Sequence, residues 1–273
     1  MGKPLLNKDT RLCISLAARP SNIGTRFHNY LYEQLGLDFI YKAFTTTDIT
    51  AAVGGVRALG IRGCSVSMPF KQDVIALVDH VEKSARAIDA VNTIVNDDGV
   101  LTAANTDYTA VQRLISEHGL DPRGSVLIRG SGGMASAVGT AFRDSGFATG
   151  TIVARNTDTG PALAERLGYE WRQDVGGAHA TVIVNVTPIG MAGGPEEHEP
   201  AFDDESIAAA RIIFDVVALP SETPLIVSAR AAGKKVVTGA DVIALQAAEQ
   251  FERYTGVRPT AEQVAAASAF SRA

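Results

Sequence analysis

A glycine turn between an apolar run and a helix-compatible segment constrains this chain most, and it lies in the stretch SVLIRGSGGMASAV, residues 125–138. Gly130 permits a tight turn, Gly132 lets the backbone approach a ligand closely, and the small Ala135 sits where a helix packs against its strand. Backbone N–H groups at such a helix start face outward, and the helix dipole favours negative charge there. The stretch therefore predicts a strand, a loop and a helix that cradle the phosphates of a dinucleotide.

The residues that follow continue this alternation of strand and helix. Residues 148–154 and 180–185 are predicted strands, and residues 157–167 between them have a helical pattern. With the glycine turn they make the βαβαβ order of a nucleotide-binding half, which is built on a parallel sheet. We therefore predict a Rossmann-type domain.

The residue at the end of the second strand of this nucleotide-binding half determines whether NAD or NADP is preferred. An acidic residue there would accept hydrogen bonds from the ribose hydroxyls of NAD, whereas this chain has Arg155, followed by Asn156 and Thr157. An arginine suits the 2′-phosphate of NADP. We expect NADP as the cofactor, and an Arg155 that is merely solvated is the alternative.

The first third of the chain alternates in the same way. Residues 11–16, 38–44 and 61–66 are predicted strands, and helical patterns run to about residue 35 and from 47 to 59, the second opened by a Thr/Asp cap. This order predicts a mainly parallel sheet covered by helices.

Residues 91–103 differ, because two strand-like runs flank the turn Asn-Asp-Asp-Gly and predict a hairpin. We expect two α/β domains: a substrate-binding domain over residues 1–108 and an NADP-binding domain over 109–238, entered by a helix over 109–119. Helical patterns over 241–255 and 260–270 predict that residues 239–273 pack back on the first domain.

Composition excludes several classes of protein. The 273 residues are 46% hydrophobic and carry a net charge of −5 without a basic run, which argues against disorder and against a nucleic-acid partner. The polar N-terminus and the absence of an apolar run of ~20 residues argue against secretion and a membrane span, so we expect a cytoplasmic protein. Cys13 and Cys64 lack a CxxC pattern, and the five histidines lack metal-ligand spacing, so we expect free thiols and no metal.

Lys71 and Asp107 are the candidate acid/base groups of the first domain. Lys71 follows the segment SVSMPF, in which Pro69 is predicted at a helix N1 position, and Asp107 ends the segment Asn-Thr-Asp after a predicted strand. Ligands gather at such strand ends in open α/β sheets. For each residue considered singly, the alternative is an ordinary solvated charge. Taken together, they can move a proton to or from an alcohol while a hydride is transferred.

Seven ordered blocks make the chain similar to the shikimate dehydrogenase family, and most to its divergent branch, the shikimate dehydrogenase-like proteins. These blocks are SVSMPFK (65–71), VNTI (91–94), NTD (105–107), GSGGMA (130–135), NVTPIGM (185–191), TPL (223–225) and LQAA (245–248).

The resemblance implies a role for each matching residue. Lys71 would be the catalytic acid/base, and Asp107 its partner and a substrate ligand. Asn92 and Gln246 would bind the hydroxyl-rich substrate, as would Ser67, which stands where the family usually has threonine. The implied cofactor residues are Gly130, Gly132, Gly133, Met134, Ala135, Arg155, Asn185, Thr187, Val216 and Gly239.

The chain departs from the family pattern in its substrate clamp. Where common members carry Ser-x-Ser-Pro, this chain has Asn22-Ile-Gly-Thr25, and Ala218 stands where a tyrosine usually lines the site. Asn22 or Thr25 would then supply the missing hydrogen bonds.

We expect interconversion of shikimate and 3-dehydroshikimate, or of a close analogue, by hydride transfer. The alternatives are a quinate or aminoshikimate dehydrogenase and a noncatalytic NADP-binding metabolite sensor. The expected partner is a polyhydroxy carboxylic acid, and the chain would be a monomer or a homodimer.

Overall fold

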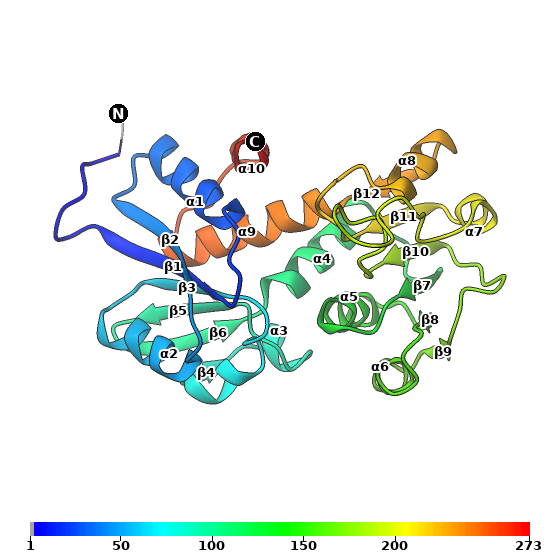
Figure 1. Cartoon of the computed structure of the whole chain (residues 1–273), viewed down its shortest axis with the longest axis horizontal. Helices are drawn as coiled ribbons and strands as arrows, with labels where there is room; N and C mark the ends of the chain where they lie inside the picture. Colours follow the sequence, from blue (N-terminus) through cyan, green and yellow to red (C-terminus); the bar gives the residue numbers. More distant parts are fainter. Residues whose placement is uncertain (1–2) are drawn as a thin grey trace. The chain divides into compact units, whose positions relative to one another are not determined.

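The structure is a computed structural model that describes residues 3–273, and it divides into two compact units (Figure 1). The first unit holds the chain up to Thr106 together with Ala244–Ala273, and the second holds Asp107–Ile243. The chain passes between the units within two helices, α4 (Thr106–Glu117) and α9 (Gly239–Thr255).

The first unit is built on a six-stranded sheet in the order β2-β1-β3-β5-β6-β4. Its strands are β1 (Arg11–Ala17), β2 (Phe39–Thr45), β3 (Gly63–Val66), β4 (His80–Val81), β5 (Thr93–Asp97) and β6 (Val100–Ala104). The pairs β1–β2, β1–β3 and β4–β6 are parallel, and β5 is antiparallel to both of its neighbours. The sheet is therefore mainly parallel, as the sequence predicts, with the expected hairpin inserted.

The hairpin between β5 and β6 turns where the sequence predicts it. Asp98 and Gly99 have φ values of 51° and 93°, which a two-residue hairpin loop of type I′ requires. The Asn96 side chain accepts a hydrogen bond from the Gly99 N–H at 2.8 Å and closes the turn.

Helices cover both faces of this sheet, because successive strand residues point to opposite sides. On one face, Cys13, Phe39 and Tyr41 pack against α1 (Ile23–Gln34), α9 and α10 (Ala261–Arg272). On the other face, Ile14 and Leu16 pack against α2 (Ile49–Ala58), the 3₁₀ helix η1 (Asp73–Leu77) and α3 (Lys83–Arg86). The predicted cap of α2 is confirmed, since the Asp48 carboxylate accepts the Ala51 N–H at 2.9 Å.

The second unit has an all-parallel sheet in the order β12-β11-β10-β7-β8-β9. Its strands are β7 (Ser125–Arg129), β8 (Thr149–Val153), β9 (Glu170–Arg172), β10 (Val182–Asn185), β11 (Ile212–Asp215) and β12 (Lys235–Val237). Its other helices are α5 (Gly133–Asp144), α6 (Thr159–Leu167), α7 (Asp204–Ala209) and α8 (Pro224–Ala231). This is the doubly wound order of a Rossmann-type domain, and the order reverses between β7 and β10.

One local prediction is wrong. Pro69 lies in a turn that leads into η1 and not at the first position of an α-helix. Phe70 and Val74 pack in the core cluster on one face of the sheet, and the backbone between them forms a turn and the start of a short 3₁₀ helix, so no α-helix begins at Pro69.

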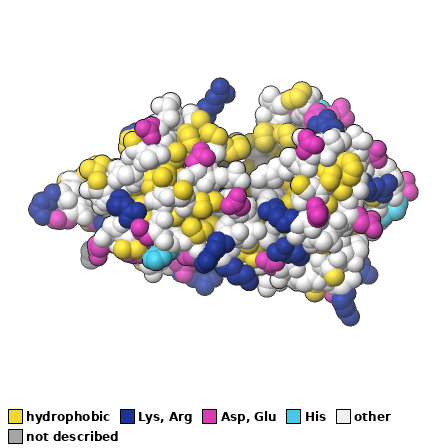
Figure 2. Space-filling model, turned by 90° about the horizontal axis from the view of Figure 1, so that it is seen from below, with side chains coloured by type: hydrophobic (Ala, Val, Ile, Leu, Met, Phe, Trp, Pro, Cys, Tyr) yellow, Lys and Arg dark blue, Asp and Glu magenta, His cyan; other side chains and the backbone are white. Residues whose placement is uncertain are grey.

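Surface charges of both signs are mixed. On the face drawn in Figure 2, Lys and Arg side chains lie interspersed with Asp and Glu side chains. Among residues 3–273, no helix is both long and apolar enough to cross a membrane.

Candidate active site

One edge of the first sheet gathers the polar residues that the sequence singles out. Strands β1 and β3 are parallel and end at this edge, whereas β5 is antiparallel to β3 and begins there. Strand β6 runs antiparallel to β5 and ends there as well. Ser67 and Lys71 follow β3, Asn92 precedes β5, and Asn22 comes after β1 at the start of α1.

Lys71 and Asn92 are held close together by the backbone. The Val91 N–H donates a hydrogen bond to the Lys71 carbonyl at 2.7 Å, and the Asn92 carbonyl accepts from the Val66 N–H at 2.9 Å. Lys71 is half-buried, and these two hydrogen bonds hold in place the turn that carries it. Ser67 is exposed beside it, and its backbone N–H is bonded to the Leu16 carbonyl at 2.9 Å.

The Asn92 side chain has one saturated end and one unpartnered end. Its Oδ1 atom accepts from the Thr93 hydroxyl at 2.8 Å and from the Thr106 N–H at 2.8 Å. Its Nδ2 atom is buried and has no hydrogen-bond partner within residues 3–273. A buried amide donor without a partner is costly, so this atom is a candidate ligand contact.

Helix α9 brings one glutamine to this edge and carries a second glutamine one turn earlier. Gln246 is half-buried, and Gln250, one turn later, donates from Nε2 to the Asn92 carbonyl at 3.2 Å and to Thr93 Oγ1 at 2.9 Å. Sequence reasoning missed Thr93, Thr106 and Gln250. The one available signal was the spacing of four residues between Gln246 and Gln250, which places them on one helix face.

The start of α1 carries Asn22 and Thr25, the residues expected to supply hydrogen bonds to the substrate in place of the Ser-x-Ser-Pro pattern. Asn22 is exposed at the N-cap position, and in the part of the chain that the structure describes its side chain makes no capping hydrogen bond. The Thr25 hydroxyl is buried, again with no hydrogen-bond partner among the described residues. Gly24 faces the ring of Tyr41, whose hydroxyl would lie 3.5 Å from an added Cβ.

Asp107 lies in the first turn of α4, where a carboxylate is favoured by the helix dipole. Only 9% of it is exposed. Lys71 belongs to the first unit, and Asp107 is the first residue of the second.

The glycine loop of the second unit lies at the point where its strand order reverses. Gly130 has a φ of 129°, and a Cβ there would lie 2.8 Å from Val186 Cγ2, so only glycine fits. A Cβ on the exposed Gly132 or Gly133 would meet no described atom within 4 Å, which leaves bare backbone facing open space. Met134 and Ala135 follow in the first turn of α5, so their N–H groups belong to the helix N-terminus.

Arg155 lies just beyond the end of β8 with 78% of its side chain exposed. Its guanidinium is 3.7 Å from the Glu196 carboxylate. Arg129, at the end of β7, donates to the Ala201 carbonyl, and burial lowers the pKa of its guanidinium. The guanidinium groups of Arg129 and Arg155 and the carboxylate of Glu196 therefore lie near the ends of β7 and β8.

Asn185 and Thr187 organise the loop after β10. The fully buried Asn185 donates from Nδ2 to the Ile189 carbonyl at 3.1 Å and to Asp215 Oδ1 at 3.0 Å, and its Oδ1 accepts from the Thr187 hydroxyl at 2.6 Å. Burial raises the pKa of Asp215 to about 6, although Val217, Thr223 and Asn185 donate hydrogen bonds that lower it. The Asn185 side chain thus holds the loop together.

Val216 and Gly239 meet at the end of β11. A Cβ on Gly239 would lie 2.5 Å from the Val216 carbonyl oxygen and 2.3 Å from that of Val217, so glycine alone lets α9 begin here. The structure therefore brings together two of the predicted cofactor residues.

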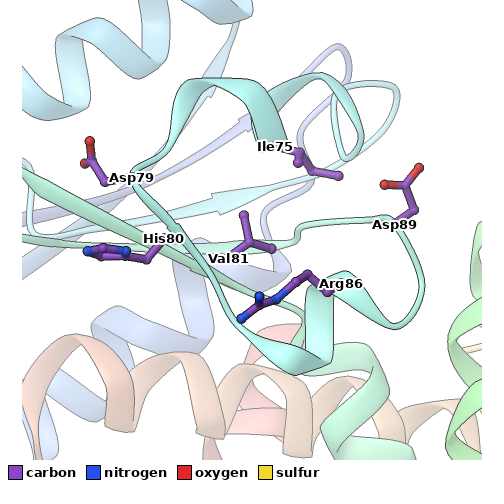
Figure 3. Close-up of a pocket in the computed structure, with 6 residues that line it drawn as sticks. All are labelled: Ile75, Asp79, His80, Val81, Arg86 and Asp89. Atoms are coloured by element: carbon purple, nitrogen blue, oxygen red, sulfur yellow. The ribbon is translucent and has the colours of Figure 1, made fainter.

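A pocket elsewhere on the first unit holds none of the predicted site residues (Figure 3). It is lined by Ile75, Asp79, His80, Val81, Arg86 and Asp89. Figure 3 shows Asp79 and Asp89 on opposite sides with their carboxyl groups pointing away from its middle. Asp79 also accepts hydrogen bonds from Arg57 and from the Leu101 N–H, both at 2.7 Å, so its carboxylate is already engaged.

Comparisons with known proteins place these features in a family. Residues 22–94 match the shikimate dehydrogenase substrate binding domain. The chain is 55% identical over 268 residues to a shikimate dehydrogenase-like protein of Haemophilus influenzae, covering 98% of this chain and 99% of the relative.

Two solved structures resemble the whole chain. One is the shikimate 5-dehydrogenase of Thermus thermophilus in complex with NADP(H) and shikimate, with a TM-score of 0.85 and 27% identity over 96% of this chain and 99% of that one. The other is the quinate dehydrogenase of Corynebacterium glutamicum in complex with NAD, with a TM-score of 0.85 and 27% identity over 96% and 98%. This chain belongs to the shikimate dehydrogenase family of oxidoreductases.

Proposed function

We propose that the chain is an NADP-dependent oxidoreductase that interconverts shikimate and 3-dehydroshikimate, or a close analogue, by hydride transfer. Lys71 and Asp107 form the acid/base pair. Asn22, Ser67, Asn92 and Gln246 bind the polyhydroxy carboxylic acid.

One observation carries this proposal: the backbone holds the turn of Lys71 against the residue before Asn92, whose buried amide nitrogen has no partner among the described residues. The hydrogen bond from Val91 to Lys71 holds the Lys71 turn next to Asn92, whose buried Nδ2 needs an acceptor. A substrate hydroxyl can accept from Asn92 and exchange its proton with Lys71. These two groups support an alcohol as the substrate.

The reaction balances with these groups. In oxidation, the carbinol C–H bond breaks and its hydride would pass to bound NADP⁺, while the hydroxyl proton passes to the Lys71 nitrogen in its neutral amine form. In reduction, Lys71 returns that proton to the alkoxide oxygen. In this proposal, Asp107 holds the lysine and the substrate in place.

NADP supplies the hydride acceptor when it is bound, and the second unit has the residues to hold it. Gly132 and Gly133 leave bare backbone at the N-terminus of α5, which suits a pyrophosphate. Arg155 suits the 2′-phosphate. Thr187, Val216 and Gly239 border the same sheet end, and Asn185 holds the loop that carries Thr187.

Quinate is the second candidate substrate. The Ser-x-Ser-Pro clamp is replaced by Asn22-Ile-Gly-Thr25, and one of the similar solved structures is a quinate dehydrogenase. The buried Thr25 hydroxyl and the exposed Asn22 side chain offer a different set of donors for a carboxylate.

The decisive measurement is the initial rate of NADP⁺ reduction with shikimate, quinate and aminoshikimate, each repeated with NAD⁺. We expect one substrate to be turned over, and Lys71→Ala to lower kcat at least about a hundredfold because the proton acceptor is lost. Lys83→Ala is the matched control, since Lys83 is an exposed lysine on α3 of the same unit.

The outcomes separate the candidates. A rate that depends on Lys71 identifies the substrate and supports the proposal. No rate on any substrate, together with NADP binding that survives Lys71→Ala, would contradict it and favour a noncatalytic sensor.

A further inference from the structure

We propose that Gln250 is a positioning residue that acts through Thr93 and, together with the Thr106 N–H, holds Asn92 so that it meets the substrate as a hydrogen-bond donor only. The inference rests on the proposed function, because it takes Asn92 as a substrate ligand. All the residues involved lie in the first unit.

The direction of the hydrogen bonds follows from the donor capacity of each group. Gln250 Nε2 is an amide nitrogen, which only donates, and it lies 2.9 Å from Thr93 Oγ1. Thr93 Oγ1 therefore accepts, and its own hydrogen is left to donate to Asn92 Oδ1 at 2.8 Å. The second Gln250 amide hydrogen serves the Asn92 carbonyl at 3.2 Å.

A backbone donor fixes which end of the Asn92 amide is the oxygen. The Thr106 N–H lies 2.8 Å from Asn92 Oδ1 and cannot act as an acceptor. A flipped amide would place its NH₂ group against this N–H and leave two buried donors facing each other, which is unfavourable. The oxygen is therefore saturated, and Nδ2 is the end left for a ligand.

Gln250 sets the polarity of this network. Thr93 Oγ1 and Thr106 Oγ1 are 3.3 Å apart, and either hydroxyl can donate to the other. Without the Gln250 donor, the Thr93 hydroxyl is free to accept from Thr106 and to turn its hydrogen away from Asn92. Gln250 thus occupies one acceptor site of Thr93 and favours the arrangement in which Thr93 and Thr106 both donate to Asn92 Oδ1.

This arrangement predicts a chemical preference. A donor-only Asn92 favours a substrate oxygen, whether hydroxyl or ketone, and disfavours a protonated amine, which has no lone pair to accept with. The same contact ties α9 to the start of β5, so it also sets the position of Gln246 one turn earlier.

The test reads the Asn92 amide directly and then its catalytic consequence. In protein labelled with ¹⁵N-asparagine, the side-chain amide signal of Asn92 is identified by its loss in Asn92→Ala. We expect this signal to shift in Gln250→Met and in Thr93→Val, which breaks the same relay from the β5 side and leaves the sequence of α9 unchanged. Thr255→Val, which removes from the last residue of the same helix a hydroxyl that is bonded to the Phe251 carbonyl, is the control and should leave the signal unchanged.

Kinetics complete the test. We expect Gln250→Met to lower kcat/KM about tenfold, the effect of losing one oriented hydrogen bond. In the Asn92→Ala background, the same change should have no further effect, because a residue that acts through Asn92 has nothing left to position.

Two results would overturn the proposal: an Asn92 signal that is unchanged in Gln250→Met and Thr93→Val, or an equal loss of kcat/KM with and without Asn92. A wild-type protein with no turnover would instead overturn the proposed function, and the Asn92 signal would still decide whether Gln250 orients the amide.

Discussion

Glu196 stands beside the residue on which the cofactor assignment depends. Its carboxylate lies 3.7 Å from the guanidinium of Arg155, so it competes with a 2′-phosphate for the same cation. We expect Glu196→Gln to lower the KM for NADP⁺ about two- to fivefold and to leave the KM for NAD⁺ unchanged, because an exposed ion pair is weak and NAD⁺ has no 2′-phosphate.

The control is Glu199→Gln, which removes the same charge three residues away from an exposed position. Equal effects of the two substitutions on NADP⁺, or equal effects of Glu196→Gln on both dinucleotides, would rule out a direct role for the pair. The comparison is made at low ionic strength, where exposed charges are screened least.

Helix α9 packs closely against β3 at Gly63. A Cβ on Gly63 would lie 2.2 to 2.5 Å from ring atoms of the fully buried Tyr254, so the helix would have to move away from the sheet. We expect Gly63→Ala to lower the free energy of unfolding by about 2–4 kcal/mol, as overpacking of a rigid site does. Urea denaturation measures this change.

Gly54→Ala is the matched control for that substitution. Gly54 lies within α2 of the same unit, and a Cβ there meets no described atom within 4 Å. It should raise stability by about 0.5–1 kcal/mol through helix propensity. A neutral Gly63→Ala would show that α9 does not rest on β3 as closely as the structure has it.

At the scale of the whole molecule, the two units should respond to acid in opposite directions. His28 is buried in the first unit, stacked on Tyr41 with ring centroids 4.4 Å apart, and burial lowers its pKa to about 3. The unfolded chain takes up this proton near pH 6.5, so stability is lost as the pH falls below that value, by about 3 kcal/mol at about pH 4.5.

Asp215 in the second unit has the reverse sign. Burial raises its pKa to about 6, so the folded state takes up a proton before the unfolded state does. Its contribution to stability is present in acid and is lost as the pH rises through about 6, which amounts to about 2 kcal/mol between about pH 4.5 and 7. Acid should therefore weaken the first unit relative to the second.

Urea unfolding at about pH 7 and about pH 4.5 measures this difference. Fluorescence of Trp171, the one tryptophan of the sequence, reports on β9 of the second unit, and hydrogen exchange of α1 peptides reports on the first. His28→Phe should abolish most of the acid loss in the α1 peptides. An unchanged pH dependence in this variant would show that other groups control it.

Much of the fold follows from local patterns, as the outcomes at particular segments show. The strands near residues 11, 38 and 125 and the hairpin near Asp98 form where apolar alternation and turn residues predict them, because these signals act over a few neighbouring residues. The short elements η1, β4 and α3 carry no such periodicity, and the helix start predicted at Pro69 is wrong for that reason.

The sequence by itself determined the two α/β units, the glycine loop at residue 130 and the family, since each depends on residue types at short spacing. Only the tertiary structure decided which groups surround Asn92. Gln250 reaches Thr93 across 157 residues of chain, and Gly63 meets Tyr254 through helix packing that no local pattern encodes. Such contacts depend on where elements dock, and docking is set by the packing of the whole core.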